Sequence, residues 1–106
     1  MTPVEAYNLV SSGNGVLVDV REEHELRESG LAEGAKWMPM SKMDEDEPDW
    51  AAFKAALPKD KTIFLYCAAG ARSGRVAEFL AQDGYQTVNI GGFKDWVRAG
   101  LPVKKF

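Results

Sequence analysis

The stretch TIFLYCAAGARSGR, residues 62–75, decides the fold. Its first five residues form a short run of β-branched and apolar side chains, which predicts a parallel strand buried on both faces. Residues 72–83 carry apolar side chains at helical spacing (Val76, Phe79 and Leu80), and Gly84 stands just past their end. The stretch therefore predicts a strand, a tight turn and an amphipathic helix, with the chain's single cysteine, Cys67, at the turn.

The same alternation of strands and helices extends in both directions. We expect a helix that begins at Pro3 behind the N-cap Thr2, and further elements as follows: helices at 21–29, 50–57 and 93–99, strands at 15–20, 35–38 and 85–90, and an acidic loop at 43–49. This order predicts an α/β fold, a three-layer sandwich in which a central parallel sheet of about five strands has helices on both faces. At 106 residues, the chain is expected to be one domain, residues 1–106.

Composition argues against several classes of protein. The formal net charge of −3 does not suit a basic surface for nucleic acid or membrane. No apolar run approaches the roughly 20 residues of a membrane span. Cys67 and His24 offer too few ligands for a metal site, so we expect no metal and no cofactor. A single cysteine and the absence of signal-peptide features in the first residues favour a cytoplasmic protein.

The turn around Cys67 has the features of an anion cradle. Gly70 can adopt a positive φ, and a curl of small residues turns successive backbone N–H groups inward. The helix that begins near Arg72 adds unpaired N–H groups and the positive end of its dipole. These groups are expected to favour the thiolate and to lower the pKa of Cys67. The alternative is an inert cysteine that fills the core, as free cysteines often do; the position between strand and helix favours a nucleophile.

Residues 67–73, C-A-A-G-A-R-S, resemble the C-x-x-G-x-R-S active-site loop of the rhodanese family. Further segments are similar to family motifs in the same order: D-V-R-E at 19–22, residues 30–35 followed by Met38-Pro39, G-G-F-K-D-W at 91–96, and G-L-P-V at 100–103. By this resemblance the chain is identified as a single-domain rhodanese-like sulfurtransferase.

The resemblance implies that Cys67 takes a sulfane sulfur from thiosulfate or a persulfide, holds it as a persulfide, and gives it to a thiol or cyanide. Backbone N–H groups of the loop are expected to stabilise the persulfide; the loop residues are Ala68, Ala69, Gly70, Ala71, Arg72 and Ser73. Asp19 and Arg21 are expected to support the loop, Asp19 through an ion pair with Arg72. The expected partners are a small sulfur donor, a thiol or cyanide acceptor and a sulfur-relay protein, without nucleic acid or membrane.

Two features depart from the family pattern. Ala68 follows the cysteine, where members active on thiosulfate often carry arginine or lysine, and Ala69 and Ala71 add no polar side chain. The lower positive charge predicts weak capture of thiosulfate and favours a persulfide as donor. Leu31 and Ala32 replace the histidine and isoleucine of the G-H-I segment, which bears on local stability more than on activity.

Two other functions remain open. Phosphatases and arsenate reductases on this scaffold carry C-x5-R, whereas Arg72 stands five positions after Cys67 and gives C-x4-R. One residue fewer removes up to about 3.5 Å of chain, which favours a single sulfur over a phosphoryl group. A persulfide carrier that works only with a partner protein would have the same loop. His24 is interpreted as a solvated surface residue, and Arg75 as a weaker anion-attracting candidate than Arg72.

Overall fold

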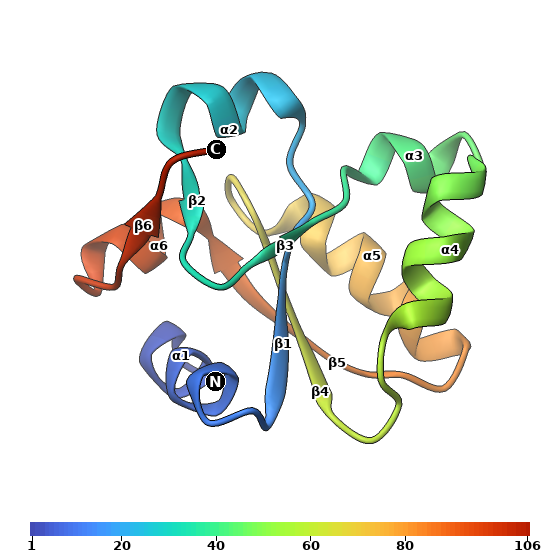
Figure 1. The fold of residues 1–106 in the computed structure, drawn as a ribbon, viewed down its shortest axis with the longest axis horizontal. Coiled ribbons are helices and arrows are strands. Elements are labelled where there is room, and N and C mark those ends of the chain that lie inside the picture. Colours follow the sequence, from blue (N-terminus) through green and yellow to red (C-terminus); the bar gives the residue numbers. More distant parts are fainter.

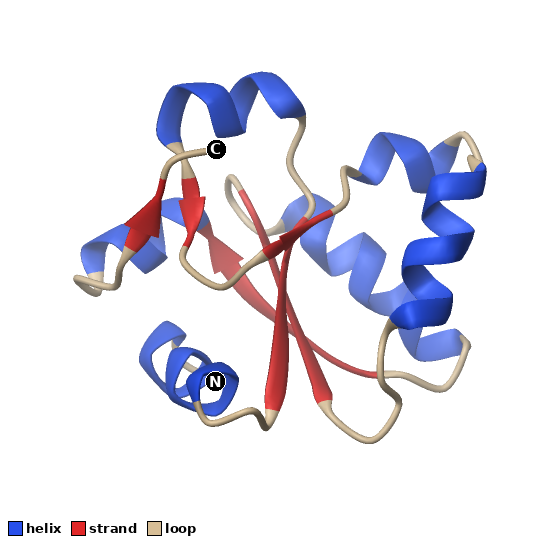
Figure 2. Ribbon diagram, in the orientation of Figure 1, coloured by secondary structure: helices blue, strands red, loops and turns tan.

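The computed structural model describes all 106 residues and has a four-stranded parallel sheet at its centre (Figures 1 and 2). The strand order is β3-β1-β4-β5, with β1 at Gly15–Asp19, β3 at Lys36–Trp37, β4 at Thr62–Cys67 and β5 at Gln86–Gly92. All three pairings are parallel. The α/β prediction is confirmed, and the sheet has four strands rather than about five.

The missing strand is explained by a separate, small sheet. Strands β2 (Leu31–Ala32) and β6 (Val103–Lys104) pair antiparallel with each other and do not join the central sheet. Each has only two residues. Such short pairs leave no clear alternating pattern in the sequence, so neither strand was expected.

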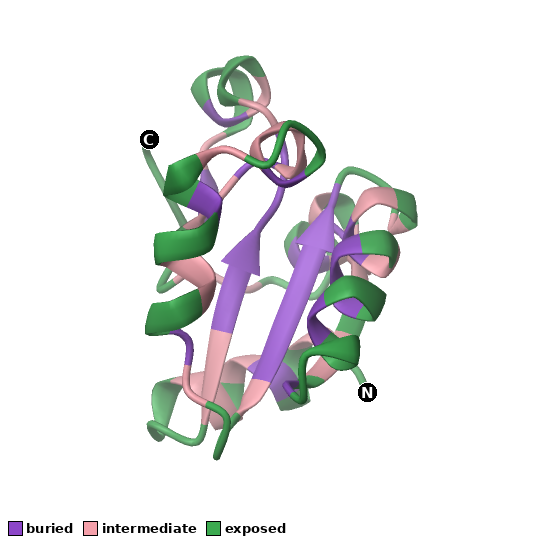
Figure 3. Cartoon of the chain, turned by 90° about the vertical axis from the view of Figure 1, so that its right-hand side faces the viewer, coloured by how far each residue is buried: buried purple, intermediate pink, exposed green.

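Helices cover both faces of the central sheet, as predicted. On one face, α3 (Met40–Asp44), α4 (Pro48–Ala56) and α5 (Ala71–Gln82) share a buried cluster with β1 and β4. On the other face, α1 (Pro3–Ser11) and α6 (Phe93–Arg98) pack with Leu17, Phe64 and Tyr66. Figure 3 shows the strands buried between helices whose outer surfaces are exposed. The remaining helix, α2 (Glu23–Ser29), lies over the carboxyl ends of the strands (Figure 1).

Local sequence signals explain several element ends. Thr2 and Glu5 form a reciprocal capping box at the start of α1, and Pro3 occupies the first turn. Five consecutive residues of β4, from Ile63 to Cys67, are buried, as a central parallel strand requires.

None of the helices combines the length and the apolar character that a membrane-spanning helix needs.

Two expectations about the helices on one face of the sheet were wrong in detail. Residues 43–49 are not a continuous loop, because α3 extends to Asp44 and α4 already begins at Pro48. Met43 explains the first helix, since its side chain is buried in the core cluster beside α5. Phe79 is 45% exposed and packs edge-on against Trp50, so the apolar face of α5 is narrower than the sequence pattern suggested.

Candidate active site

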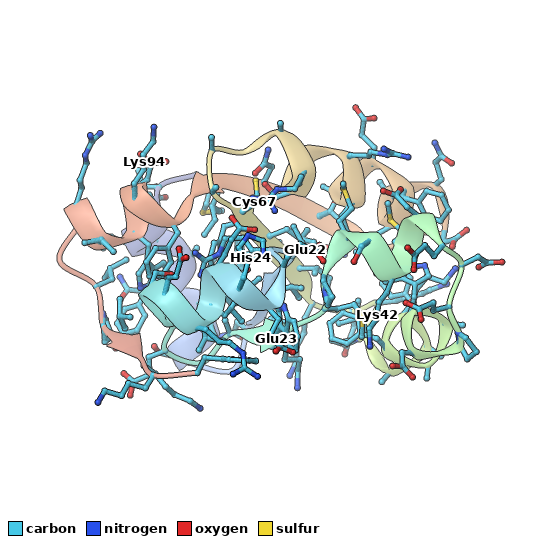
Figure 4. All side chains as sticks on the ribbon, turned by 90° about the horizontal axis from the view of Figure 1, so that it is seen from above. Glu22, Glu23, His24, Lys42, Cys67 and Lys94 are labelled. Carbon is cyan, nitrogen blue, oxygen red and sulfur yellow. The ribbon has the colours of Figure 1, made fainter.

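Cys67 is the last residue of β4, at the end of the sheet that α2 covers. The labelled cysteine lies in the middle of the molecule in Figure 4, which looks down on that end. The residue is 1% exposed and belongs to the core cluster that α3, α4 and α5 share. Burial alone would suit an inert thiol, so the polar groups around the sulfur decide what Cys67 can do.

Polar groups of the following turn point at the sulfur. The Gly70 N–H donates to Cys67 Sγ at 2.9 Å, and Ser73 Oγ lies 3.3 Å from Sγ. Gly70 has φ 106°, a left-handed conformation that glycine adopts without steric cost, and it immediately precedes the first turn of α5. The turn therefore directs its N–H groups toward one atom instead of toward solvent.

This arrangement favours the thiolate. Burial raises the pKa of Cys67, but hydrogen bonds from the Ser73 hydroxyl and from the backbone N–H groups of Ser73, Gly70 and Ala69 outweigh it. The pKa of the thiol consequently lies below its ordinary value. Cys67 is therefore a core residue whose surroundings favour the thiolate. An inert core cysteine would lack such donors.

Close contact with β5 fixes the position of the turn. A Cβ atom on Gly92 would overlap the Ala68 carbonyl oxygen, so the turn passes directly over the backbone of the strand. Cys67 pairs with Gly92 and Leu65 with Asn89, so β5 has one more residue than β4 in this interval, a β-bulge. Gly91 within it has φ 98°. The two adjacent glycines thus serve a bulge and a close approach.

Arg72 pairs with Glu25 of α2, and the expected ion pair between Arg72 and Asp19 is absent. Arg72 Nη1 and Nη2 donate to Glu25 Oε1 and Oε2 at 2.6 and 2.8 Å. A hydrogen bond from Arg72 lowers the pKa of Glu25 to about 2, and Glu25 in turn raises the pKa of Arg72. The prediction failed because Asp19 already has a nearer arginine, two positions along the chain.

That arginine is Arg21, and its pair with Asp19 is buried below the site. Arg21 Nη2 and Nε donate to Asp19 at 2.8 and 3.1 Å, and the Arg21 backbone N–H donates to the same carboxylate at 2.8 Å. The guanidinium also donates to Ser29 and to the Gly30 carbonyl, and lies 4.3 Å from the Phe93 ring centre. Asp19 and Arg21 hold the ends of β1, α2 and α6 together without contacting the sulfur.

The exposed side chains of the turn after Cys67, which we call the mouth of the site, are methyl groups. Ala68, Ala69 and Ala71 are exposed, and the one arginine of the loop is neutralised by Glu25. Two hollows indent the surface elsewhere: about 380 Å³ between α2 and the C-terminal segment, and about 250 Å³ beside α4. Cys67 lines neither of them. The sulfur therefore lies buried beneath the turn and not in a cavity that encloses a substrate.

Sequence reasoning missed two residues of this site, Glu25 and Asn89. Glu25 carried one usable signal, because it stands three positions after Glu22 and forms a capping box with it at the start of α2. Asn89 accepts a hydrogen bond from Ser73 Oγ at 2.7 Å and donates to the Gly70 carbonyl at 2.8 Å. His24 is exposed on α2, as expected, and Arg75 pairs with Asp44 at 2.9 Å.

Comparisons with known proteins match nearly the whole chain. The family model described as a rhodanese-like domain matches residues 2–99. A thiosulfate sulfurtransferase GlpE from Actinobacillus succinogenes is 34% identical over 106 residues, covering 98% of this chain and 88% of that protein.

Two solved structures are similar over most of their length. A rhodanese-related protein from Thermoplasma volcanium has a TM-score of 0.78 at 30% identity, covering 98% of this chain and 95% of its own. The human single-domain sulfurtransferase TSTD1 has a TM-score of 0.74 at 27% identity, with 92% and 94% covered.

Proposed function

The chain belongs to the family of rhodanese-like domains, and from this premise we propose that it is a sulfurtransferase that carries sulfane sulfur on Cys67 as a persulfide. The observation that carries the proposal is the Gly70 N–H aimed at Cys67 Sγ at 2.9 Å, in a turn whose neighbouring amides favour the thiolate. Residues 1–106 act as one domain in this proposal.

The reaction takes place in two steps at one sulfur atom. In the first, the Cys67 thiolate attacks the outer sulfur of the donor, the donor's S–S bond breaks, and the electron pair leaves as sulfite or as the donor's thiolate. In the second, cyanide or a thiolate attacks the outer sulfur of the Cys67 persulfide and regenerates the Cys67 thiolate. No side chain has to remove a proton in either step once the thiolate has formed.

The donor is proposed to be a persulfide rather than free thiosulfate. Thiosulfate is a dianion, and its capture needs positive charge at the mouth. Here the mouth has alanine side chains, Arg72 is paired with Glu25, and no hollow at Cys67 encloses a small anion. A persulfide on a small thiol or a relay protein needs only to present its outer sulfur at the mouth.

The shortness of the loop supports sulfur over phosphate. Four residues separate Cys67 from Arg72, and the Gly70 N–H already contacts Sγ at 2.9 Å. A phosphoryl group needs room for three oxygens above the nucleophile, whereas a persulfide adds one atom. A reducing compartment such as the cytoplasm suits the proposal, because it protects the free Cys67 thiolate from oxidation between cycles.

Intact-mass measurement tests the proposal directly. The reduced protein is incubated with glutathione persulfide or with thiosulfate, desalted and weighed, then treated with cyanide and weighed again. We expect Cys67 to gain one sulfur atom, more readily from the persulfide, and to lose it to cyanide as thiocyanate. The Cys67→Ser variant is the matched control and should gain nothing.

Two other outcomes distinguish the alternatives. Hydrolysis of a phosphate monoester without any sulfur loading would replace the sulfurtransferase by a phosphatase. Loading by a protein-bound persulfide, but by neither small donor, would assign the chain to the non-autonomous relay.

A further inference from the structure

Asn89 is exposed at the bulge of β5, and its carboxamide hydrogen-bonds to Gly70 and Ser73 after Cys67 and to Gly91 of its own strand. Its Nδ2 donates to the Gly70 carbonyl at 2.8 Å, and its Oδ1 accepts from the Gly91 N–H at 3.0 Å and from Ser73 Oγ at 2.7 Å. Gly74 makes room for this contact, because a Cβ atom there would lie 3.2 Å from Asn89 Nδ2. Hydrogen bonds rather than packing hold the side chain in place.

These partners fix which end of the carboxamide faces Ser73. The Gly91 backbone N–H can only donate, so the Asn89 atom beside it must be the oxygen. The Gly70 carbonyl can only accept, so the atom beside it must be the nitrogen. Ser73 Oγ therefore faces a carbonyl oxygen and can hydrogen-bond to it only as the donor.

The Ser73 hydroxyl has one proton and three acceptors within reach. They are Asn89 Oδ1 at 2.7 Å, the Gly70 carbonyl at 3.2 Å and Cys67 Sγ at 3.3 Å. The Gly70 carbonyl already accepts from Asn89 Nδ2 and from the Gly74 N–H. Asn89 and the sulfur are thus the two real competitors for the proton.

We propose that Asn89 is a positioning residue of the sulfur site, which acts on Cys67 by competing with its sulfur for the Ser73 proton. When Sγ is a neutral thiol, or is uncharged within a persulfide, the proton stays on the 2.7 Å bond to Asn89. When Sγ is a thiolate, the hydroxyl turns toward it and breaks that bond. Asn89 thereby disfavours the bare thiolate relative to the thiol and the persulfide.

This inference rests on the proposed role of Cys67 as a nucleophile, but not on sulfur transfer itself. Three arginines near the sulfur are in ion pairs: Arg72 with Glu25, Arg21 with Asp19, and Arg75 with Asp44. Glu22 accepts from Ser41 and Asp95 from the Gly92 N–H, and Glu78 of α5 is exposed. None of these groups is hydrogen-bonded to Asn89 or Ser73, so we expect their influence to be the same in all variants and to cancel in the comparison.

The test measures the pKa of Cys67 from the pH dependence of its alkylation rate by iodoacetamide. Asn89→Ala frees the Ser73 proton for the sulfur, and we expect the pKa of Cys67 to fall by about half a pH unit to one unit, the equivalent of one neutral hydrogen bond. Asn89→Asp keeps the acceptor and adds negative charge, so we expect the pKa to rise. A side chain that only braced the turn would move the pKa in the same direction in both variants.

A double-mutant cycle shows whether the effect passes through Ser73. In the Ser73→Ala background there is no proton to compete for, and Asn89→Ala should leave the pKa of Cys67 unchanged. Thr87→Val is the matched control, because Thr87 Oγ1 also donates from β5 to α5, at 3.0 Å to the Ala77 carbonyl, but away from the turn. It should not move the pKa.

Three results would overturn the inference: an unchanged pKa in Asn89→Ala, a rise in that variant, or an equal shift with and without Ser73. Because alkylation does not need a sulfur donor, these results are distinguishable from failure of the sulfurtransferase proposal. If Asn89→Ala does not fold, the isosteric Asn89→Asp variant carries the test in the same cycle: its rise in pKa should be smaller in the Ser73→Ala background, and an equal rise with and without Ser73 would overturn the inference.

Discussion

Two arginine–carboxylate pairs lie at the same end of the sheet and differ in what surrounds them. Asp19–Arg21 is buried, with side-chain exposures of 0% and 4%, and joins secondary-structure elements. Glu25–Arg72 is partly open, with exposures of 20% and 29%, and joins α2 to the start of α5, after the turn that follows Cys67. We infer from this comparison that the Asp19–Arg21 pair stabilises the scaffold, whereas the Glu25–Arg72 pair affects the charge and the position of the turn after Cys67.

Removing the charge of Asp19 should have the largest effect on stability. Asp19→Asn leaves the buried Arg21 guanidinium without its counter-ion, and we expect the free energy of unfolding to fall by about 3 kcal/mol or more. Urea denaturation measures this loss. Since Asp19 does not contact the sulfur, the pKa of Cys67 in the folded fraction should stay as in the wild type. A large change in that pKa with normal stability would reverse the division of tasks.

Removing the charge of Glu25 should change specificity more than stability. Glu25→Gln leaves Arg72 uncompensated near the sulfur and costs about 1 kcal/mol of unfolding free energy, because the pair is partly solvated. The freed positive charge should raise kcat/KM for thiosulfate relative to glutathione persulfide by about three- to tenfold. A ratio equal to that of the wild type would show that Glu25 does not limit the capture of the dianion.

Acid should weaken the Glu25–Arg72 pair over a defined pH range. The pKa of Glu25 is lowered from its ordinary value of 4.5 to about 2, so its carboxylate contributes stability that is complete above pH 4.5 and is lost as the pH falls toward 2. We expect this contribution to be about 1 kcal/mol after allowance for solvent screening. Urea titrations between pH 5 and about 2 measure it as the difference between wild type and Glu25→Gln, whose curves should converge in acid.

A third pair should show almost no effect and so calibrates the other two. Arg27 and Glu23 form an i,i+4 pair on α2, with exposures of 69% and 52%. We expect Arg27→Gln to change the free energy of unfolding by about 0.5 kcal/mol or less and to leave sulfur loading unchanged. A larger loss would mean that α2 depends on its surface charges, and the contrast between the first two pairs would then need to be measured again.

Local signals made much of the scaffold predictable. The apolar run of β4, the helical spacing of α5 and the capping box at Thr2 depend on neighbours in the chain, and the corresponding elements lie within a few residues of their expected bounds. The α3 helix was missed because its five residues lie next to an acidic stretch that resembles a loop. Strands β2 and β6 are defined only by each other, and the paired residues Ala32 and Val103 are 71 positions apart in the sequence.

The site was predictable where one short segment makes it, and not where distant segments meet. The turn after Cys67 follows from small residues and a glycine before a helix. The partner of Arg72 does not, because Glu25 is 47 positions away, and from the sequence alone Asp19 was an equally plausible acid. Asn89 lies 16 positions from Ser73, and its carboxamide meets the turn at a β-bulge that the sequence does not reveal.

The contact between Gly92 and the Ala68 carbonyl links the turn to the strand beneath it. The backbone of the turn lies directly on β5, so a residue inserted into the turn has no space on the strand side. It must extend toward solvent, away from the donors that now converge on the sulfur. Converting this protein to a chemistry with a bulkier transferred group would therefore demand redesign of two segments at once. Grafting a longer loop alone should leave the N–H donors of the turn misaligned with Cys67 Sγ.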